Sequence, residues 1–376
     1  MSSAEVAGVV DAAITTDTPN APSTRLVPRT RISPTFDPDD FLPKRNPAKS
    51  CNAGAVACRD AVVVGAGHNG LVAACCLARA GRDVVVLEAS DRPGGGSRTE
   101  ETAGHRFDMH SVAHNIINMT VIPGQLDLAG AGLVYQGMDP FSVAVFADGR
   151  RVRFHRSVEA TVDSIADPYG PHRPVRASSH RRGPPLHQRL PPYPNSRAGD
   201  WNGLQSFVDR LDDLVVGWAA SEARRLPDLL PLYAFTTSAI DDTLAPSGHH
   251  TVYLACPAAP SLIRGGWPAH REEFVERCLE TVEDRAPGFR ASIVGVATHT
   301  PDEMERAGRW PGAHPMYLDL ALDQLGPFRP TRRLGRHRTP VQGLYLSGAG
   351  TGPTGGIAGT PGRAAAMALL ADVSPS

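Results

Sequence analysis

The residues with the clearest chemical meaning form a glycine-rich turn next to the first strongly apolar segment. Gly65, Gly67 and Gly70 have the spacing G-x-G-x-x-G, between the apolar run 61–64 and the alanine- and leucine-rich stretch 71–80. In such a turn the first glycine permits a sharp bend, the second lets a pyrophosphate approach the backbone, and the third lets a helix pack closely on a sheet. The free N–H groups and the dipole at the helix N-terminus favour negative charge. The turn therefore predicts a site for a dinucleotide pyrophosphate.

A carboxylate stands where the ribose of such a dinucleotide is expected. Residues 83–88 read as a second buried strand, and Glu88 ends it 23 positions after Gly65. A carboxylate at about this separation accepts hydrogen bonds from the ribose hydroxyls in dinucleotide-binding folds. Strand, glycine turn, helix, strand and terminal carboxylate together predict a β-α-β unit. We also expect His68, Asn69 and Ala89 beside the cofactor.

A second glycine-rich segment follows this carboxylate closely. Residues 92–99 read RPGGGSRT. The three glycines leave backbone amides free to crowd a phosphate or a flavin, and the two arginines bring positive charge that pairs with phosphate oxygens. The members expected at the cofactor are Gly94, Gly95, Gly96 and Arg98.

The third glycine-rich segment lies near the other end of the sequence. Six of the twelve residues from 348 to 359 are glycines, after a segment at 343–347 that reads as a strand and before an alanine-rich stretch at 363–370 that reads as a helix. Each glycine costs conformational freedom on folding, so this density indicates that something approaches the backbone closely. One elongated cofactor explains both distant regions, with ADP at the first and a ribityl chain and ring at the second. The residues expected there are Gly348, Gly350, Gly355, Gly356 and Ile357.

The composition indicates a globular protein whose partner is a small molecule. Of the 376 residues 41% are hydrophobic, which is enough to bury a core, and 38 basic residues balance 39 acidic ones. The sequence therefore offers no strong field to recruit nucleic acid or an anionic membrane. No apolar stretch reaches 18 residues and no secretory signal begins the sequence, so we expect no integral membrane segment. The expected location is cytoplasmic, with the mitochondrial matrix as the alternative in a eukaryote.

The six cysteines form neither a metal-site pattern nor a disulfide framework. They lie at 51, 58, 75, 76, 256 and 278, without a C-x-x-C pair. Cys75 and Cys76 fall inside an apolar helical run, where we expect at least one of them to be a small buried hydrophobe. We therefore expect no metal site and a reducing compartment.

The remaining sequence divides at a segment with the composition of a linker. Residues 142–146 and 151–154 flank Asp148-Gly149, which predicts a hairpin. Residues 167–199 carry eight prolines and three histidines with almost no aliphatic residues, so they read as a flexible linker. RNA binding is the alternative for this basic stretch, but aromatic residues are not interleaved with its charges. Beyond it, helices are expected at 201–225 and 270–285, and strands at 251–256 and 292–298.

The glycine-rich segments together resemble a known family of flavoproteins. The sequences VVVGAGHNG at 62–70, PGGG at 93–96 and LYLSGAG at 344–350 resemble the phytoene-desaturase-like branch of the FAD-dependent amine-oxidase superfamily. The resemblance implies FAD as the cofactor, held by the residues named above.

Three further segments are similar to one group of that branch, the pyridine nucleotide-disulfide oxidoreductase domain-containing protein 2 group. They are DTLAP at 242–246, APGF at 286–289 and LDQL at 322–325. Despite the name of the group, no redox disulfide is expected here. The resemblance covers about 60–167 and 240–370. The long substrate-binding region that such proteins carry between these parts is replaced by the short Pro/Arg-rich stretch.

The resemblance implies an α/β fold with two parts. One is a Rossmann-like FAD/NAD(P)-binding domain with a parallel sheet, and the other is a reduced α+β substrate region. The expected organisation is a disordered leader at 1–59, the FAD-binding domain at 60–166 and 335–372, the linker at 167–200 and a remnant substrate domain at 201–334.

The resemblance also implies an FAD-dependent oxidoreductase of dehydrogenase or desaturase type, which transfers a hydride from an organic, apolar substrate to flavin. Asp108, His110 and His114 follow the second glycine segment. His114 is the candidate for proton transfer, and a structural histidine is the alternative. A non-catalytic flavin-fold protein with an interaction or regulatory role is the alternative function, and an amine oxidase is a further one. The sequence assigns no oligomeric state.

Overall fold

The computed structural model describes residues 11–13, 59–108, 110–167, 190–197, 199–308, 310–314, 316–318 and 321–373. The chain forms two compact units, each built from separate stretches. Unit 1 contains Met1–Pro19, Thr99–Val112 and Tyr135–Pro315, and unit 2 contains Asn20–Arg98, Ala113–Val134 and Met316–Ser376. Most of the predicted leader and most of the predicted linker lie outside the described residues.

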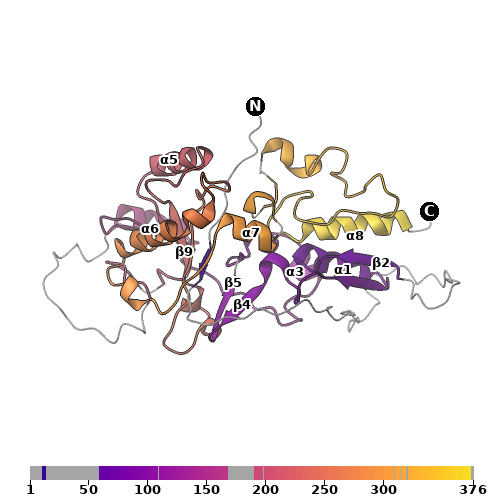
Figure 1. The fold of residues 1–376 in the computed structure, drawn as a ribbon. Helices are drawn as coiled ribbons and strands as arrows, with labels where there is room; N and C mark the ends of the chain where they lie inside the picture. Colours follow the sequence, from indigo (N-terminus) through magenta and orange to yellow (C-terminus); the bar gives the residue numbers. More distant parts are fainter. Residues whose placement is uncertain are drawn as a thin grey trace. The chain divides into compact units, whose positions relative to one another are not determined.

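Unit 2 contains a β-α-β arrangement, visible around α1 in Figure 1. Strands β2 (Ala61–Val64) and β3 (Val84–Leu87) pair in parallel, with Val62 opposite Val85, and helix α1 (His68–Arg79) connects them. Alternate residues of both strands are buried in one apolar core with α1. The α/β fold with a parallel sheet, predicted from the sequence, is confirmed.

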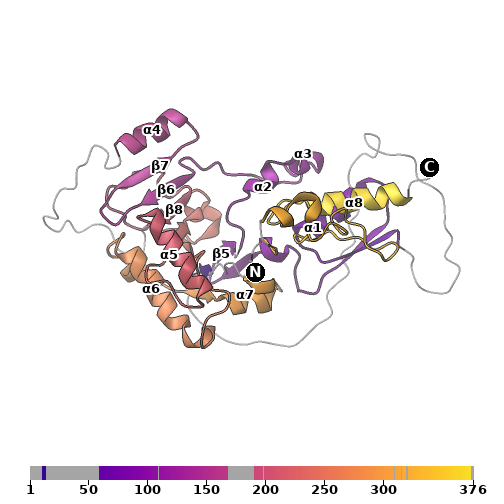
Figure 2. The same ribbon diagram turned by 90° about the horizontal axis from the view of Figure 1, so that it is seen from above.

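The C-terminal helix α8 (Thr360–Val373) belongs to the same unit and lies along α1, as both views show (Figures 1 and 2). The two backbones approach closely because Gly362 has no side chain. A Cβ at that position would lie 1.9 Å from the carbonyl oxygen of Asn69. Segments from distant parts of the sequence therefore share one core, which the proposal of a single elongated cofactor requires.

Short helices and irregular chain complete unit 2. Helices α2 (Asn115–Asn118) and α3 (Ile122–Gln125) add Ile117 and Ile122 to the core around α1. The short 3-10 helices of this unit are η2 (Gly95–Ser97), η9 (Leu322–Gln324) and η10 (Gly326–Phe328).

The strand predicted at 343–347 does not form. The structure has only a single bridge there, between Arg338 and Tyr345. The N–H of Leu346 donates to the carbonyl of His337 at 2.8 Å, and the ring Nδ1 of His337 lies 2.8 Å from the carbonyl oxygen of Leu346. The prediction was wrong because this apolar segment folds against the chain just before it and does not join β2 and β3.

Unit 1 is built on a seven-stranded sheet with the order β11-β1-β10-β9-β8-β6-β7. Neighbouring strands are antiparallel except for the parallel pair β6 and β8. The strands are β1 (Asp11–Ala13), β6 (Ser142–Val145), β7 (Arg151–Phe154), β8 (Leu204–Phe207), β9 (Leu232–Phe235), β10 (Tyr253–Ala255) and β11 (Ala297–His299). The hairpin predicted around Asp148-Gly149 is confirmed as β6 and β7, with Val145 opposite Arg151.

Helices pack on this sheet, and a separate hairpin completes the unit. Phe274 and Leu279 on α6 are buried with Leu232 and Leu254 of the sheet. Figure 2 shows α4 beside β7, and the two elements are in contact. The helices are α4 (Val158–Ala166), α5 (Leu211–Glu222), α6 (Arg271–Glu283) and α7 (Pro301–Gly308), with short 3-10 helices η4 (Thr237–Ala239), η5 (Asp242–Leu244), η6 (Trp267–Ala269), η7 (Arg290–Ser292) and η8 (Pro311–Ala313). The separate hairpin is β4 (Thr99–Thr102) with β5 (His105–Asp108).

Several sequence-based expectations differ from the structure. Strand β1 lies within the expected disordered leader 1–59, but it pairs with β10 and β11 in the sheet of unit 1. The single helix expected at 201–225 is strand β8 followed by α5, because β8 pairs with both β6 and β9. Residues 135–166, assigned to the FAD-binding domain, belong to unit 1 through the pairing of β6 and β7 in its sheet. Conversely, the described residues from 316 to 334, assigned to the substrate domain, belong to unit 2. The described end of the expected linker, at 190–197 and 199–200, also packs in unit 1, where Tyr193 is part of the core.

Candidate functional site

The glycine turn at 65–70 adopts the geometry that its spacing predicts. Gly65 has a φ of +98°, and its N–H donates to the carbonyl of Leu87 at 2.7 Å, so the turn is tied to the end of β3. Gly67 is extended, with a φ of −70° and a ψ of 168°, and α1 begins at the next residue. A Cβ on Gly70 would lie 2.0 Å from the carbonyl oxygen of Gly65. Glycine at positions 65 and 70 is therefore explained by backbone conformation and close packing.

The second glycine segment lies directly against this turn. The N–H of Gly94 donates to the carbonyl of Ala66 at 2.8 Å, and Gly67 forms a bridge with Gly94. A Cβ on Gly95 would lie 3.0 Å from the Cα of Gly67. The two loops therefore meet backbone to backbone, and side chains are excluded from the contact. Gly96 and Arg98 follow at η2, and Arg98 lies 3.8 Å from the carboxylate of Asp91.

Glu88 connects the end of β3 to the glycine turn. One carboxylate oxygen accepts the N–H of Ala66 at 2.6 Å, and the other accepts the N–H groups of Ala89 and Ser90 and the hydroxyl of Ser90, each at 2.9 Å. Burial alone would raise the pKa of Glu88, but these hydrogen bonds, led by those from Ser90 and Ala66, hold it below its ordinary value. Among the described residues, the oxygen that faces Ala66 accepts one hydrogen bond, so it retains acceptor capacity for a ribose hydroxyl.

Two polar atoms in these loops lack partners within the described part of the chain. They are Oδ1 of Asn69, a residue that is 4% exposed, and the hydroxyl of Ser97. Buried polar groups are almost always hydrogen-bonded. Two polar atoms without partners, beside loops that meet through backbone atoms alone, therefore indicate that a polar ligand binds there. The region therefore fits the phosphate-bearing half of a dinucleotide. It offers exposed backbone, free hydrogen-bonding atoms and a carboxylate.

The glycines of the C-terminal segment fall into two groups. A Cβ on Gly348 or Gly350 would meet no described atom within 4 Å. A Cβ on Gly355 would lie 2.3 Å from the carbonyl oxygen of Met316, and one on Gly356 would lie 2.8 Å from the sulfur of Met316. The protein itself therefore fills the space at 355 and 356, whereas 348 and 350 present open backbone. Ile357 is partly buried against the core of unit 2.

A histidine links the two glycine-rich regions. The Nε2 of His68, at the first position of α1, lies 3.0 Å from the carbonyl oxygen of Gly356. Since a carbonyl only accepts, this nitrogen carries the proton. Burial lowers the pKa of His68, with a smaller contribution from nearby His114, so the ring is neutral at pH 7. The contact places residues 68 and 356 side by side, as the proposal of one long cofactor requires.

Arg329 is a site residue that the sequence did not reveal. Its side chain is fully buried, and its Nε and Nη2 donate to the carbonyl of Ala349 at 3.2 and 3.0 Å. Further bonds go to the carbonyls of Gln324, at 3.1 Å, and of Met316. Burial lowers its pKa. The guanidinium thereby holds the backbone between Gly348 and Gly350, and no pattern in the sequence distinguishes this arginine from the others.

The three residues after the second glycine segment separate in the structure. His114 lies in unit 2, half-buried, directly before α2, and near enough to His68 to affect its pKa. Asp108 and His110 lie in unit 1. Asp108 accepts a bond of 2.6 Å from the hydroxyl of Thr99, and the ring of His110 packs edge-on against Trp310 at 4.5 Å. Only His114 therefore shares a unit with the glycine loops.

The described residues also bear on the other sequence expectations. Cys76 is buried in α1 and Cys75 is half-buried, and burial raises the pKa of both thiols. In the part of the chain that the structure describes, no helix is long and apolar enough to cross a membrane. Within the same residues, no group of three or more His, Cys, Asp or Glu side chains is placed to hold a metal.

Comparison with known proteins identifies the β-α-β region. Residues 63–119 match the family of NAD(P)-binding Rossmann-like domains. Pyridine nucleotide-disulfide oxidoreductase domain-containing protein 2 of Rattus norvegicus is 32% identical over 194 residues, which are 50% of this chain and 33% of that protein.

Two further relatives, a dehydrogenase and a desaturase, match over shorter stretches. A 4,4'-diapolycopen-4-al dehydrogenase of Metabacillus indicus is 35% identical over 36% of this chain and 26% of its own length. A neurosporene-forming phytoene desaturase of Cereibacter sphaeroides is 32% identical over 39% of this chain and 28% of its own length. The matched region thus spans about a third or less of these relatives. The chain carries a Rossmann-like dinucleotide-binding domain and is related over part of its length to dehydrogenases and desaturases.

Proposed function

We propose that unit 2 binds FAD and that the protein is an FAD-dependent oxidoreductase of dehydrogenase or desaturase type. The observation that carries the proposal is the contact of His68 with Gly356, which joins glycine loops 288 residues apart in the sequence. A nicotinamide dinucleotide needs only the first of these loops in the motif that the sequence displays. A second open glycine backbone in the same unit favours a longer cofactor.

The residues proposed to hold the cofactor divide into two sets. The ADP half would lie against the first two glycine segments, where the unpaired atoms of Asn69 and Ser97 are found. The flavin half would lie near Gly348 and Gly350, whose backbones are open. The full proposed set is Gly65, Gly67, His68, Asn69, Gly70, Glu88, Ala89, Gly94, Gly95, Gly96, Arg98, Gly348, Gly350, Gly355, Gly356 and Ile357.

Within this set the structure suggests different tasks for neighbouring residues. Gly355 and Gly356 would act by letting the loop pack on Met316, and Gly348 and Gly350 would face the cofactor. Arg329 would keep the open glycines in place through the carbonyl of Ala349. These tasks follow from where a side chain has room and where it does not.

The chemistry would be removal of hydrogen from a small organic molecule. Bound FAD supplies an acceptor for a hydride, and the protein supplies position and a dry environment. His114, in the same unit as both glycine regions, is the proposed residue for moving the accompanying proton. One of the related proteins is named for the desaturation of phytoene, a hydrocarbon, and this favours an apolar substrate.

The test begins with the purified full chain. We expect it to be yellow, to release FAD on denaturation, and to lose its flavin absorbance when mixed without oxygen with an isoprenoid substrate. Gly67→Val should weaken FAD binding at least about tenfold, since its side chain would enter the contact with Gly95. Gly124→Ala is the matched control in the same unit, because a Cβ there meets nothing within 4 Å among the described atoms.

Each other outcome has a clear meaning. Protein that takes up no FAD, or that takes up NAD in its place, would overturn the cofactor proposal. Protein that holds FAD but is bleached by neither isoprenoids nor amines would support the non-catalytic alternative. Bleaching by amines alone would assign the protein to the amine oxidases.

A further inference from the structure

Two arginines on the buried face of one strand in unit 1 differ in their hydrogen-bond partners. Arg151 and Arg153 alternate with half-buried residues along β7, and both are almost completely buried, with 1% and 4% of their surfaces exposed. Burying a guanidinium costs free energy unless the charge is paired and its N–H groups are hydrogen-bonded. The partners of the two side chains therefore show whether each charge is compensated.

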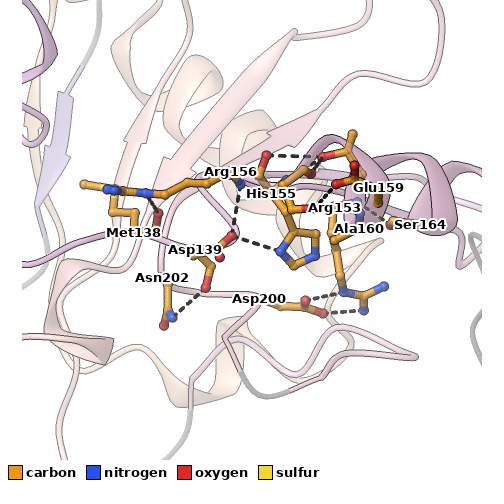
Figure 3. A network of polar contacts seen from close by, with 12 residues as sticks. Met138, Asp139, Arg153, His155, Arg156, Glu159, Ala160, Ser164, Asp200 and Asn202 are labelled. Carbon is orange, nitrogen blue, oxygen red and sulfur yellow. Dashed lines mark hydrogen bonds and ion pairs between the residues drawn. The ribbon is translucent and has the colours of Figure 1, made fainter.

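Arg153 is fully compensated, as Figure 3 shows. Its Nε and Nη2 donate to the two carboxylate oxygens of Asp200 at 2.5 and 2.7 Å, and Nη2 also lies 3.2 Å from the carbonyl of Asn195. The side chain of Asp200 is as deeply buried as its partner. This pair has the two-pronged geometry in which arginine binds a carboxylate most strongly.

Arg151 has no such partner. Only its Nη1 is engaged, by the carbonyls of Phe146 at 3.1 Å and Arg150 at 2.6 Å. Its Nε and Nη2 have no hydrogen-bond partner in the described chain, and neither does the hydroxyl of Tyr193, a residue that is 3% exposed. The guanidinium carbon lies 5.7 Å from the centre of the Tyr193 ring. Two neighbouring buried side chains therefore have three donor atoms without a hydrogen-bond partner among the described residues.

The nearby acids do not supply the missing charge. The carboxylate of Asp200 is occupied by Arg153 and by the N–H of Arg197, at 2.8 Å. Asp209 accepts the Nη2 of Arg285 at 2.8 Å. Among the described residues no carboxylate pairs with Arg151, and although burial lowers its pKa to about 10, it stays protonated at neutral pH. The sequence from 168 to 189 contains no aspartate or glutamate.

We infer that the Nε/Nη2 edge of Arg151 and the hydroxyl of Tyr193 bind the carboxylate group of a small organic acid. The same edge of Arg153 already holds a carboxylate, so β7 carries two arginine edges of the same kind, and in the described part of the chain one of the two is paired with an acid. A monoanion matches the single positive charge of Arg151. A flat carboxylate also matches two parallel N–H groups better than a tetrahedral phosphate does.

The test measures thermal unfolding of the full chain with increasing formate or acetate, at constant pH and ionic strength. All four tryptophans (Trp201, Trp218, Trp267 and Trp310) lie in unit 1, so their fluorescence reports on the unit that contains the site. We expect the midpoint to rise with acetate and then saturate, as binding to the folded state requires. Acetamide, which has the same shape without the charge, should have no such effect.

Variants separate the site from general effects of salt. Arg151→Met should abolish the acetate response and leave the acetate-free protein at least as stable, because a buried charge without a partner is removed. Tyr193→Phe keeps the ring against Trp201 and Phe207 and should weaken acetate binding about tenfold. Arg150→Met is the control, since Arg150 is half-exposed and pairs with Asp148.

The outcomes that would overturn the inference are distinct. An acetate response that is absent, or equal in wild type, Tyr193→Phe and Arg151→Met, would mean that water satisfies these donors. A saturating response to phosphate but not to acetate would overturn the carboxylate assignment. If Arg151→Met does not fold, Tyr193→Phe still decides the matter. None of these results depends on whether unit 2 binds FAD.

Discussion

In the turn 65–70 and the neighbouring segment 94–96, the glycines bring two stretches of backbone into contact. In the segment 348–359, by contrast, the protein's own atoms fill the space beside two of the glycines that were expected to contact the cofactor. Gly70 and Gly95 are required because a Cβ would strike backbone atoms of Gly65 and Gly67. In the C-terminal segment, Met316 occupies the space where a Cβ on Gly355 or Gly356 would lie. A Cβ on Gly348 or Gly350 would meet no described atom within 4 Å. An identical compositional signal therefore has two physical causes, tight packing and access for a ligand.

The largest effect should come from the tightest glycine. Gly70→Ala would place a Cβ 2.0 Å from the carbonyl oxygen of Gly65, against rigid backbone. We expect a loss of about 3 kcal/mol or more in the stability of unit 2, because neither α1 nor the turn can shift without breaking the core. Amide hydrogen exchange of α1 measures this directly. Gly124→Ala should change the same exchange by less than about 0.5 kcal/mol.

A smaller but substantial loss is expected at Arg329. Arg329→Met would leave the carbonyls of Ala349 and Gln324 without their buried donor, at a cost of about 2 kcal/mol. The loop at 348–350 should then hold FAD less tightly, which a flavin fluorescence titration measures. Arg333→Met, on an exposed side chain nearby in the sequence, is the matched control. Equal FAD affinity in the two variants would contradict a role for Arg329 in positioning the loop.

The segment 348–359 allows a direct comparison between an open glycine, Gly348, and a tightly packed one, Gly355. Gly348→Ala should leave the stability of unit 2 within about 0.5 kcal/mol and weaken FAD binding about tenfold, because its Cβ has room in the protein but would face the cofactor. Gly355→Ala should lower stability with or without FAD, since its Cβ would lie 2.3 Å from the carbonyl oxygen of Met316. If Gly348→Ala binds FAD normally, the open glycines do not face the flavin.

The smallest effect is expected at His68, whose ring connects the first glycine turn to Gly356. The pKa of His68 is lowered in the folded protein by burial, so the unfolded chain binds a proton more readily. The stabilisation from a neutral His68 is therefore complete above pH 6.5, its ordinary pKa, and is lost as the pH falls from there toward the folded-state value. In His68→Gln the free energy of unfolding of unit 2 should depend less on pH between 7 and 5 than in the wild type. Hydrogen exchange across this pH range measures it. A wild-type protein whose unfolding free energy does not change between pH 7 and 5 would contradict a lowered pKa of His68.

The sequence alone determined the local chemistry of the nucleotide region. The β-α-β unit, the turn at Gly65 and the hairpin around Asp148-Gly149 depend on neighbouring residues, whose periodicity and turn preferences are visible in a short window. The segment 201–225 and the apolar run 343–347 were misread because their pairing depends on strands elsewhere in the chain, and an isolated apolar window does not reveal its partner.

Tertiary structure alone decided which residues act together. The contacts of His68 with Gly356 and of Arg329 with Ala349 join positions 288 and 20 residues apart. The unpaired edge of Arg151 is recognisable only beside the satisfied Arg153. Residue type and spacing set what each group can donate or accept. Burial and the presence or absence of a partner depend on the packing of the whole chain, and these decide whether a group supports the fold or is left to bind a ligand.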